Sequence, residues 1–195
     1  EETMRIEKLT EESKQNLLEN LLKRSPSQYG SYEAQVAEIL EHVRTQKDRA
    51  LFDYTLKFDK AEIGADNIKI TEEEIQEAYK EVEPSLLQVI RKALVNIEEY
   101  HKKQMQYSWF DSKPNGTLLG QKVTALRRVG VYVPGGKAVY PSSVLMNIMP
   151  AKVAGVDEII MTTPPDKNGK VNPNTLVAAK EAGATAIYKV GGAQA

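Results

Sequence analysis

The sequence predicts an α/β protein in which a helical N-terminal region precedes a parallel β-α domain. Three observations indicate this class. Apolar residues recur at helical spacing through the first half of the chain, short β-branched runs alternate with helical patterns in the second half, and glycine-rich turns follow two of those runs. Strands that alternate with helices form parallel sheets with right-handed crossovers.

The first predicted helix carries a leucine stripe made of Leu17, Leu18, Leu21 and Leu22. Thr10 is its candidate N-cap, and Ser25-Pro26 ends the stripe. Few other apolar residues lie nearby, so the helix would be poorly buried alone. It is expected to pack either on a partner subunit or on its own chain, and the pattern does not favour one over the other.

Four more helices are expected before the sheet. Thr71 and Glu74 form a capping box for the third of these, and Pro84 suits the first turn of the fourth, which extends to about Gln104. Their apolar faces are Val36, Ile39, Leu40 and Val43; Ala50, Leu51, Tyr54 and Phe58; Ile75, Ala78, Tyr79 and Val82; and Leu87, Ile90, Leu94 and Ile97.

A short antiparallel ribbon is expected next. Trp109 and Phe110 stand among polar residues, Pro114-Asn115-Gly116 is a turn signal, and 118–126 can return as the second strand. Three parallel strands then follow, with helices between them. The strands are expected at 129–133, 158–163 and 185–190, and the helices at 143–154 and 173–180.

These elements suggest a division into three parts. Residues 1–25 form the N-terminal helix, 26–131 a mainly helical region that ends in the ribbon, and 132–195 a truncated sheet domain. No helix follows the third strand to cover that part of the sheet, although parallel sheets are normally buried on both faces. The sequence is therefore expected to be a fragment of a longer protein.

Glycine-rich turns follow the first and third parallel strands, at 134–136 and 191–192. We expect them on neighbouring strands, sharing one edge of the sheet, because ligands of such folds bind at the carboxyl ends of strands. A phosphate-binding loop is excluded by spacing, since Gly136 stands between Gly135 and Lys137, so that the lysine comes one place late and no hydroxyl residue follows it.

Two side chains accompany these turns. Tyr132 can stack on a ligand ring, or it can be a core tyrosine with a satisfied hydroxyl. Gln194 can donate and accept hydrogen bonds at the same edge, or it can be a surface glutamine. Pattern alone favours the second alternative in each case. The expected position of both side chains at one sheet edge, however, favours a shared site.

Composition narrows the function classes. The 26 basic and 27 acidic residues leave a net charge of −1, which gives no reason to expect nucleic acid as a partner. There is no cysteine. No apolar run approaches the about 18 residues of a membrane span, and the N-terminal residues lack the apolar segment of a signal peptide. A soluble cytoplasmic protein is expected.

No catalytic or metal-binding set is visible. His42 and His101 belong to no metal-ligand spacing and are expected to be ordinary helix residues. Arg127 and Arg128 can attract an anion, although solubility at a strand edge is the favoured interpretation. The residues themselves therefore predict a binding face without a catalyst.

Several ordered motifs resemble histidinol dehydrogenases over nearly the whole chain. The N-terminal half agrees through ALFDYTLKFD (Ala50–Asp59) and the stretch from Asn96 to His101. The motifs of the second half are GVYVPGG (Gly130–Gly136), YPSSVLMN (Tyr140–Asn147), PAKVAGV (Pro150–Val156), TPP (Thr163–Pro165) and VGGAQA (Val190–Ala195).

This resemblance implies an enzyme that oxidises L-histidinol to L-histidine through the aldehyde, with two NAD-dependent hydride transfers and a zinc ion in each active site. It implies an aldehyde dehydrogenase-like fold with incomplete Rossmann-like domains, and an intertwined homodimer to which the N-terminal helix contributes. Tyr132 and Gln194 match the family positions that contact NAD.

The family's zinc ligands, substrate contacts and acid/base pair lie beyond the last motif, so none is assigned here, and the fragment alone is expected to be inactive. The alternative is a non-catalytic nucleotide-binding or regulatory module that is complete at this length.

Overall fold

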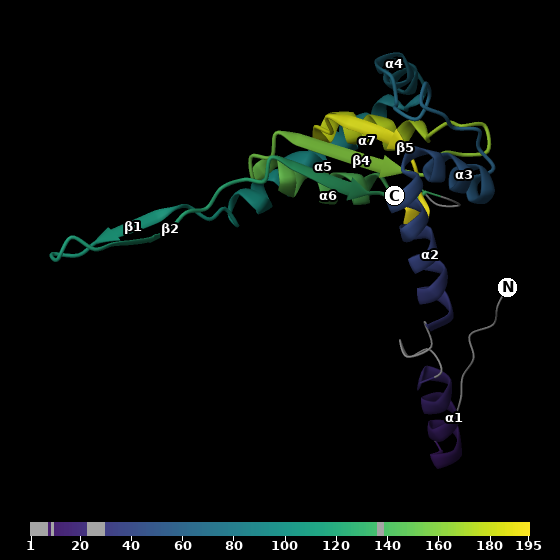
Figure 1. The fold of residues 1–195 in the computed structure, drawn as a ribbon, viewed down its shortest axis with the longest axis horizontal. Coiled ribbons are helices and arrows are strands. Elements are labelled where there is room, and N and C mark those ends of the chain that lie inside the picture. The colour runs from purple at the N-terminus through teal and green to yellow at the C-terminus, as the bar shows by residue number, and fades with distance from the viewer. Residues whose placement is uncertain (1–7, 9, 23–29, 136–138) are drawn as a thin grey trace.

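The computed structural model describes residues 8, 10–22, 30–135 and 139–195 of the 195-residue chain. Figure 1 shows a helical and β-sheet body with a ribbon and two helices extending from it. The helices of the described part are α1 (Glu11–Leu22), α2 (Gly30–Gln46), α3 (Asp48–Asp59), α4 (Glu72–Glu81), α5 (Pro84–Lys102), α6 (Pro141–Val153), α7 (Pro173–Ala182) and the short 3-10 helix η2 (Gly192–Gln194). The strands are β1 (Trp109–Ser112), β2 (Leu118–Gln121), β3 (Arg128–Tyr132), β4 (Glu158–Thr163) and β5 (Ala186–Lys189).

The expected order of helices and strands is confirmed, with local differences in length. The predicted capping box at Thr71 and Glu74 is present at the start of α4. Gly183 ends α7 with a left-handed φ of 101°, as a C-terminal glycine does. The second ribbon strand is shorter than expected, because the Ser108 hydroxyl bonds both the N–H and the carbonyl of Val123 in place of a strand partner.

Strands β3, β4 and β5 form a parallel sheet in that spatial order. The expectation that the two glycine turns follow neighbouring strands was wrong, because β4 lies between β3 and β5. The far edge of β5 is covered by a short extended segment. Ile70 donates its N–H to the carbonyl of Ile187 at 2.9 Å, and Lys189 donates its N–H to the carbonyl of Ile68 at 2.8 Å.

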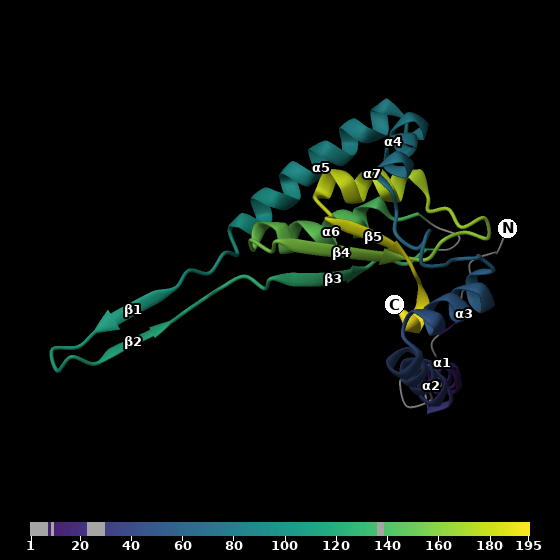
Figure 2. The same cartoon turned by 45° about the horizontal axis from the view of Figure 1, so that its top comes forward.

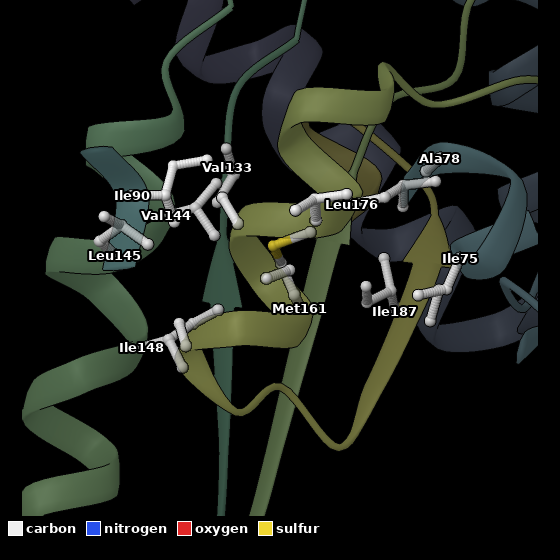
Figure 3. Packing of buried hydrophobic residues seen from close by; sticks show 14 of the residues in the cluster. Ile75, Ala78, Ile90, Val133, Val144, Leu145, Ile148, Met161, Leu176 and Ile187 are labelled. Atoms are coloured by element: carbon white, nitrogen blue, oxygen red, sulfur yellow. The ribbon is translucent and has the colours of Figure 1, made fainter. Parts of the chain in front are cut away.

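One face of the sheet forms the core. Helices α6 and α7 lie against it, and α4 and α5 pack on their outer side (Figure 2). Along each strand every second residue points into this layer, so Met161 and Ile187 meet Leu176 of α7 (Figure 3). Other buried residues of this cluster are Ile75, Ala78, Ile90, Val133, Val144, Leu145 and Ile148.

The same cluster bears on the predicted three-part division. Residues of α4 and α5, which precede position 132, share one core with residues of β4 and β5. The boundaries after residues 25 and 131 remain predictions, and the cluster shows that helices on one side of the second boundary cover the sheet on the other side.

The ribbon of β1 and β2 projects from the body (Figure 1). All eight of its strand residues are exposed, and Trp109 and Phe110 expose 55% and 61% of their surface. Phe110 stands opposite Gly120, where an added Cβ would lie 2.4 Å from the Phe110 ring. A two-stranded ribbon is at best marginally stable alone in water, and in the described part of the chain no other element buries the residues of these two strands.

The N-terminal helices are also poorly covered. The Thr10 hydroxyl accepts a hydrogen bond from the N–H of Ser13 at 3.1 Å, which confirms the predicted cap. The side chains of the leucine stripe and Ser25-Pro26 lie outside the described residues. In α2 the predicted apolar face is mostly not buried, since Val36 and Leu40 are exposed. Among the described helices, none is long and apolar enough to cross a membrane.

A polar network joins three of the helices that cover the sheet. Glu181 of α7 accepts hydrogen bonds from the Tyr79 hydroxyl of α4 at 2.7 Å and from Nε of Arg91 in α5 at 2.8 Å. The bond from Arg91 is the main reason that the pKa of the Glu181 carboxyl lies below its usual range. Burial, and then the bond to Glu181, raises the pKa of the Tyr79 hydroxyl.

We predict that this network makes stability depend on acid pH. Because the folded pKa of Glu181 is depressed, its contribution is complete above the ordinary glutamate pKa of about 4.3 and is lost as the pH falls below it. Glu181→Gln should therefore reduce the free energy of unfolding at pH 7, and the difference from the parent should shrink in acid. Tyr79→Phe should cost about 1 kcal/mol.

Urea unfolding at a series of pH values measures both effects. The exposed Glu77→Gln in α4 is the matched control and should leave the curve unchanged. A constant difference between parent and Glu181→Gln across the acid range would contradict the assignment.

Candidate functional site

The three parallel strands end at one edge of the sheet, where three turns lie side by side. Pro134-Gly135 follows β3, Pro164-Pro165 follows β4, and Gly191-Gly192 comes two residues after the last residue of β5. Gly136 and Lys137 of the first turn lie outside the described residues. The carboxyl edge of a parallel sheet is where ligand sites of this class are built, so the two sequence-predicted glycine turns and both candidate side chains converge there.

Pro164 occupies the space between the two glycine turns. A Cβ added at Gly135 would lie 2.5 Å from Cγ of Pro164, and one added at Gly191 would lie 2.4 Å from its Cβ. Real Cβ atoms essentially never come so close to another atom. Packing against Pro164 therefore requires glycine at both positions, independently of any ligand.

Tyr132 lies at the carboxyl end of β3 on the face of the sheet opposite α6 and α7. Its side chain is 44% exposed, so the favoured interpretation as a core tyrosine was wrong. Its hydroxyl accepts a hydrogen bond from the N–H of Gly192 at 3.2 Å. The side chain thus reaches across the end of β4 and joins the first turn to the third, while its ring stays open to solvent.

Gln194 lies in η2 and is only 4% exposed, so the interpretation as a surface glutamine was also wrong. Neither its amide oxygen nor its amide nitrogen has a hydrogen-bond partner in the described part of the chain. The side chain folds back toward Gly192, whose φ is +69° and where a Cβ would lie 2.6 Å from Oε1 of Gln194. A buried amide without partners is costly, and a polar ligand group is one way to satisfy it.

A cavity of about 330 Å³ opens beside Gln194 on the same face of the sheet. Phe52 of α3 and Tyr188 of β5 are among its lining residues, and Thr162 adds a hydroxyl. Aromatic walls with a few polar groups suit a flat heterocyclic ring. The exposed Tyr132 ring, the unpartnered amide and this cavity together offer aromatic surface and hydrogen-bonding groups on one face of the sheet.

A second cavity, of about 500 Å³, lies on the other face of the same edge. Among the described residues its charged lining is mainly acidic: Glu74, Glu77, Glu81 and Asp166, with Lys170 as the basic member. Carboxylates repel phosphate oxygens at short range, so these described side chains do not favour an anionic ligand here.

An ion pair between a buried lysine and a half-buried glutamate lies at the border of this acidic cavity. Lys189 of β5 is 5% exposed, and its Nζ lies 2.6 Å from Oε1 of Glu74. The other carboxylate oxygen of Glu74 accepts the N–H of Thr71 at 2.9 Å, which completes the capping box of α4. One glutamate therefore holds both the end of β5 and the start of α4.

The remaining polar candidates do not line either of these two cavities. Nε of Arg128 bonds Glu158 at 2.7 Å at the amino end of the sheet, and Arg127 lies 3.8 Å from the same carboxylate. His42 bonds the Tyr54 hydroxyl at 2.6 Å, and His101 bonds Gln104 at 2.6 Å. The described residues contain no group of three or more His, Cys, Asp or Glu that could hold a metal ion.

Sequence reasoning located the edge but missed three of its residues. Pro164 appeared only within the TPP motif (Thr163–Pro165), although two glycine turns flanking a Pro-Pro turn could have suggested its role. In the sequence, Phe52 and Tyr188 are indistinguishable from ordinary apolar residues of a helix and a strand. No local pattern distinguishes them, because the fold alone brings α3 to the end of β5.

Comparison with known proteins gives one consistent family. A sequence model of histidinol dehydrogenase matches residues 22–195. The chain is 50% identical over 177 residues to a histidinol dehydrogenase of Heliobacterium mobile, covering 91% of this chain and 42% of that protein. It is 56% identical over 160 residues to one of Bacillus subtilis, covering 82% and 37%.

A solved structure agrees with the sequence relatives. The crystal structure of histidinol dehydrogenase from Elizabethkingia anophelis matches with a TM-score of 0.77 and 36% identity, over 83% of this chain and 37% of that one. The chain thus spans about two fifths of the length of the relatives it matches.

We predict that Tyr132→Phe loosens the third turn. Removing the hydroxyl leaves the N–H of Gly192 without its acceptor, which costs about 1 kcal/mol, or about a fivefold gain in local opening. Hydrogen–deuterium exchange at the Gly192 amide should accelerate accordingly. Tyr188→Phe, on the same sheet face, is the control and should leave the exchange rate of the Gly192 amide unchanged. Equal exchange rates in the parent and in Tyr132→Phe would show that the hydrogen bond does not stabilise the turn.

Proposed function

This chain belongs to the histidinol dehydrogenase family, and from that membership we propose that it is the N-terminal part of a cytoplasmic enzyme of histidine biosynthesis. The enzyme oxidises L-histidinol to L-histidine through L-histidinal. Each of the two steps passes a hydride to NAD, and a water supplies the second carboxylate oxygen. The observation that carries this proposal is the match of residues 22–195 to the family, at about half identity to its curated relatives.

Within that enzyme, we assign this chain a share of the dinucleotide site. Bound NAD would supply the hydride acceptor. The Tyr132 ring offers a stacking surface, its hydroxyl holds the third turn through Gly192, and the Gln194 amide offers unused hydrogen-bonding capacity. These contacts support binding and orientation, which raise the rate only when the substrate is held beside the cofactor.

Zinc and proton transfer are assigned to other parts of the enzyme. The described residues do not fit a zinc site, because they contain no suitable cluster of ligands. His42 and His101 each bond a nearby side chain, and neither lines a cavity at the carboxyl edge of the sheet. No step of the reaction is therefore assigned to a metal or a general base of this chain.

We also propose that the enzyme is a homodimer and that the β1–β2 ribbon joins the two copies. The support is the exposure of large apolar side chains at Trp109, Phe110, Leu118 and Leu119 on a ribbon that projects from the body. Burial of such side chains in a second copy would give the ribbon the cover that its own chain lacks in the described part.

The first test is the reaction itself. The complete enzyme should produce NADH from histidinol, and Tyr132→Ala should raise the KM for NAD about tenfold while the KM for histidinol stays unchanged. The 195-residue chain alone, supplied with histidinol, NAD and zinc, should produce no NADH above background.

Tyr100→Ala is the matched control, since this tyrosine is exposed on α5, in the outer helical layer. Turnover by the 195-residue chain would contradict the assignment of chemistry to other parts of the enzyme. An unchanged KM for NAD in Tyr132→Ala would remove this tyrosine from the site.

The second test is the mass of the enzyme in solution. Replacing both Trp109 and Phe110 by serine should convert the dimer to monomer, because it removes the largest apolar area of the ribbon. Sedimentation velocity or light scattering measures the change. Tyr100→Ser removes an exposed aromatic elsewhere and should leave the dimer intact; a dimer that survives the double substitution would exclude the ribbon from the contact.

A further inference from the structure

Pro164 is placed differently from any other residue of the candidate site. It directly follows the central strand β4, whose last residues pair with β3 on one side and β5 on the other. Its neighbour Thr163 is buried, and the proline ring itself has no freedom of rotation. The flanking glycines approach it so closely that neither has room for a methyl group.

We propose that Pro164 is a positioning residue of the dinucleotide site. Its ring acts as a spacer between the two glycine turns and sets the distance that the Tyr132 hydroxyl must span to reach Gly192. The position of Tyr132 and the fold of η2, and with it Gln194, then depend on this spacer. The inference rests on the proposed function for its link to NAD, and on geometry alone for the spacing.

The contacts of Pro164 with the two glycines differ in the atoms involved. At Gly135 an added Cβ would meet Cγ at 2.5 Å and Cδ at 3.2 Å, both of which Pro164→Ala removes, and the backbone oxygen at 3.3 Å, which remains. At Gly191 it would meet Cβ at 2.4 Å and Cα at 3.0 Å, both of which alanine retains, and Cγ at 2.9 Å, which is removed. The closest contact is therefore removed at Gly135 and retained at Gly191, so the same substitution should relieve most of the first clash and leave most of the second.

This difference defines a double-mutant experiment on the complete enzyme. The single variants are Gly135→Ala, Gly191→Ala and Pro164→Ala, and each glycine variant is also combined with Pro164→Ala. Thermal unfolding without NAD reports the clash, and the KM for NAD, compared with kcat and with the KM for histidinol, reports the position of the turns. Gly130→Ala in β3 is the control, since an added Cβ there meets no atom of the described part within 4 Å.

Each glycine variant should unfold at a lower temperature than the parent. In the Pro164→Ala background, Gly135→Ala should lose most of its cost in stability, whereas Gly191→Ala should keep most of its cost. Pro164→Ala alone should raise the KM for NAD about tenfold, with the KM for histidinol unchanged. Gly130→Ala should match the parent in each measurement.

The spacer role of Pro164 would be overturned if the stability losses of Gly135→Ala and Pro164→Ala were additive in the double variant. It would also be overturned if Pro164→Ala rescued both glycine variants equally. A selective rescue in thermal unfolding without any change in the KM for NAD would confirm the packing and overturn the positioning role. If the parent enzyme does not use NAD, the proposed function fails, whereas the unfolding cycle still decides whether Pro164 separates the turns.

Discussion

The burial of a single face of the parallel sheet is the constraint on which the rest of this structure depends. Helices α6 and α7 cover that face, and α4 and α5 cover those helices in turn. The opposite face carries Tyr132, Thr162 and Tyr188 in one row across the three strands. Because this row is not part of the core, its side chains are free to take a role in binding, and the candidate site lies at its end.

Much of this architecture could be predicted from local patterns. The capping box at Thr71 and Glu74 and the stop at Gly183 were recognisable because each depends on a few adjacent residues. The alternation of strands and helices was recognisable for the same reason. The exposure of Tyr132 and the burial of Gln194 were not, because each depends on which element the fold brings over the sheet edge.

The glycine turns show why sequence alone left the site ambiguous. Glycine permits a ligand to approach the backbone, and it equally permits another part of the chain to do so. Here Pro164 is the close neighbour at both Gly135 and Gly191. The shape of the turns is thus set by packing within the protein, and a ligand at this edge would meet a geometry that the packing already provides. This packing depends on the position of β4 between the other two strands, and that position cannot be inferred from the spacing of the motifs.

Glu74 has a consequence for how this segment can vary. Its two oxygens serve different partners, the backbone of Thr71 and the ammonium group of the buried Lys189. An aspartate at position 74 is one methylene shorter and cannot contact both partners. A neutral residue there leaves the buried ammonium group of Lys189 without its counter-charge. Substitutions at positions 74 and 189 are therefore coupled. Loss of the carboxylate at 74 is tolerated only when an aliphatic residue replaces Lys189 earlier or at the same time.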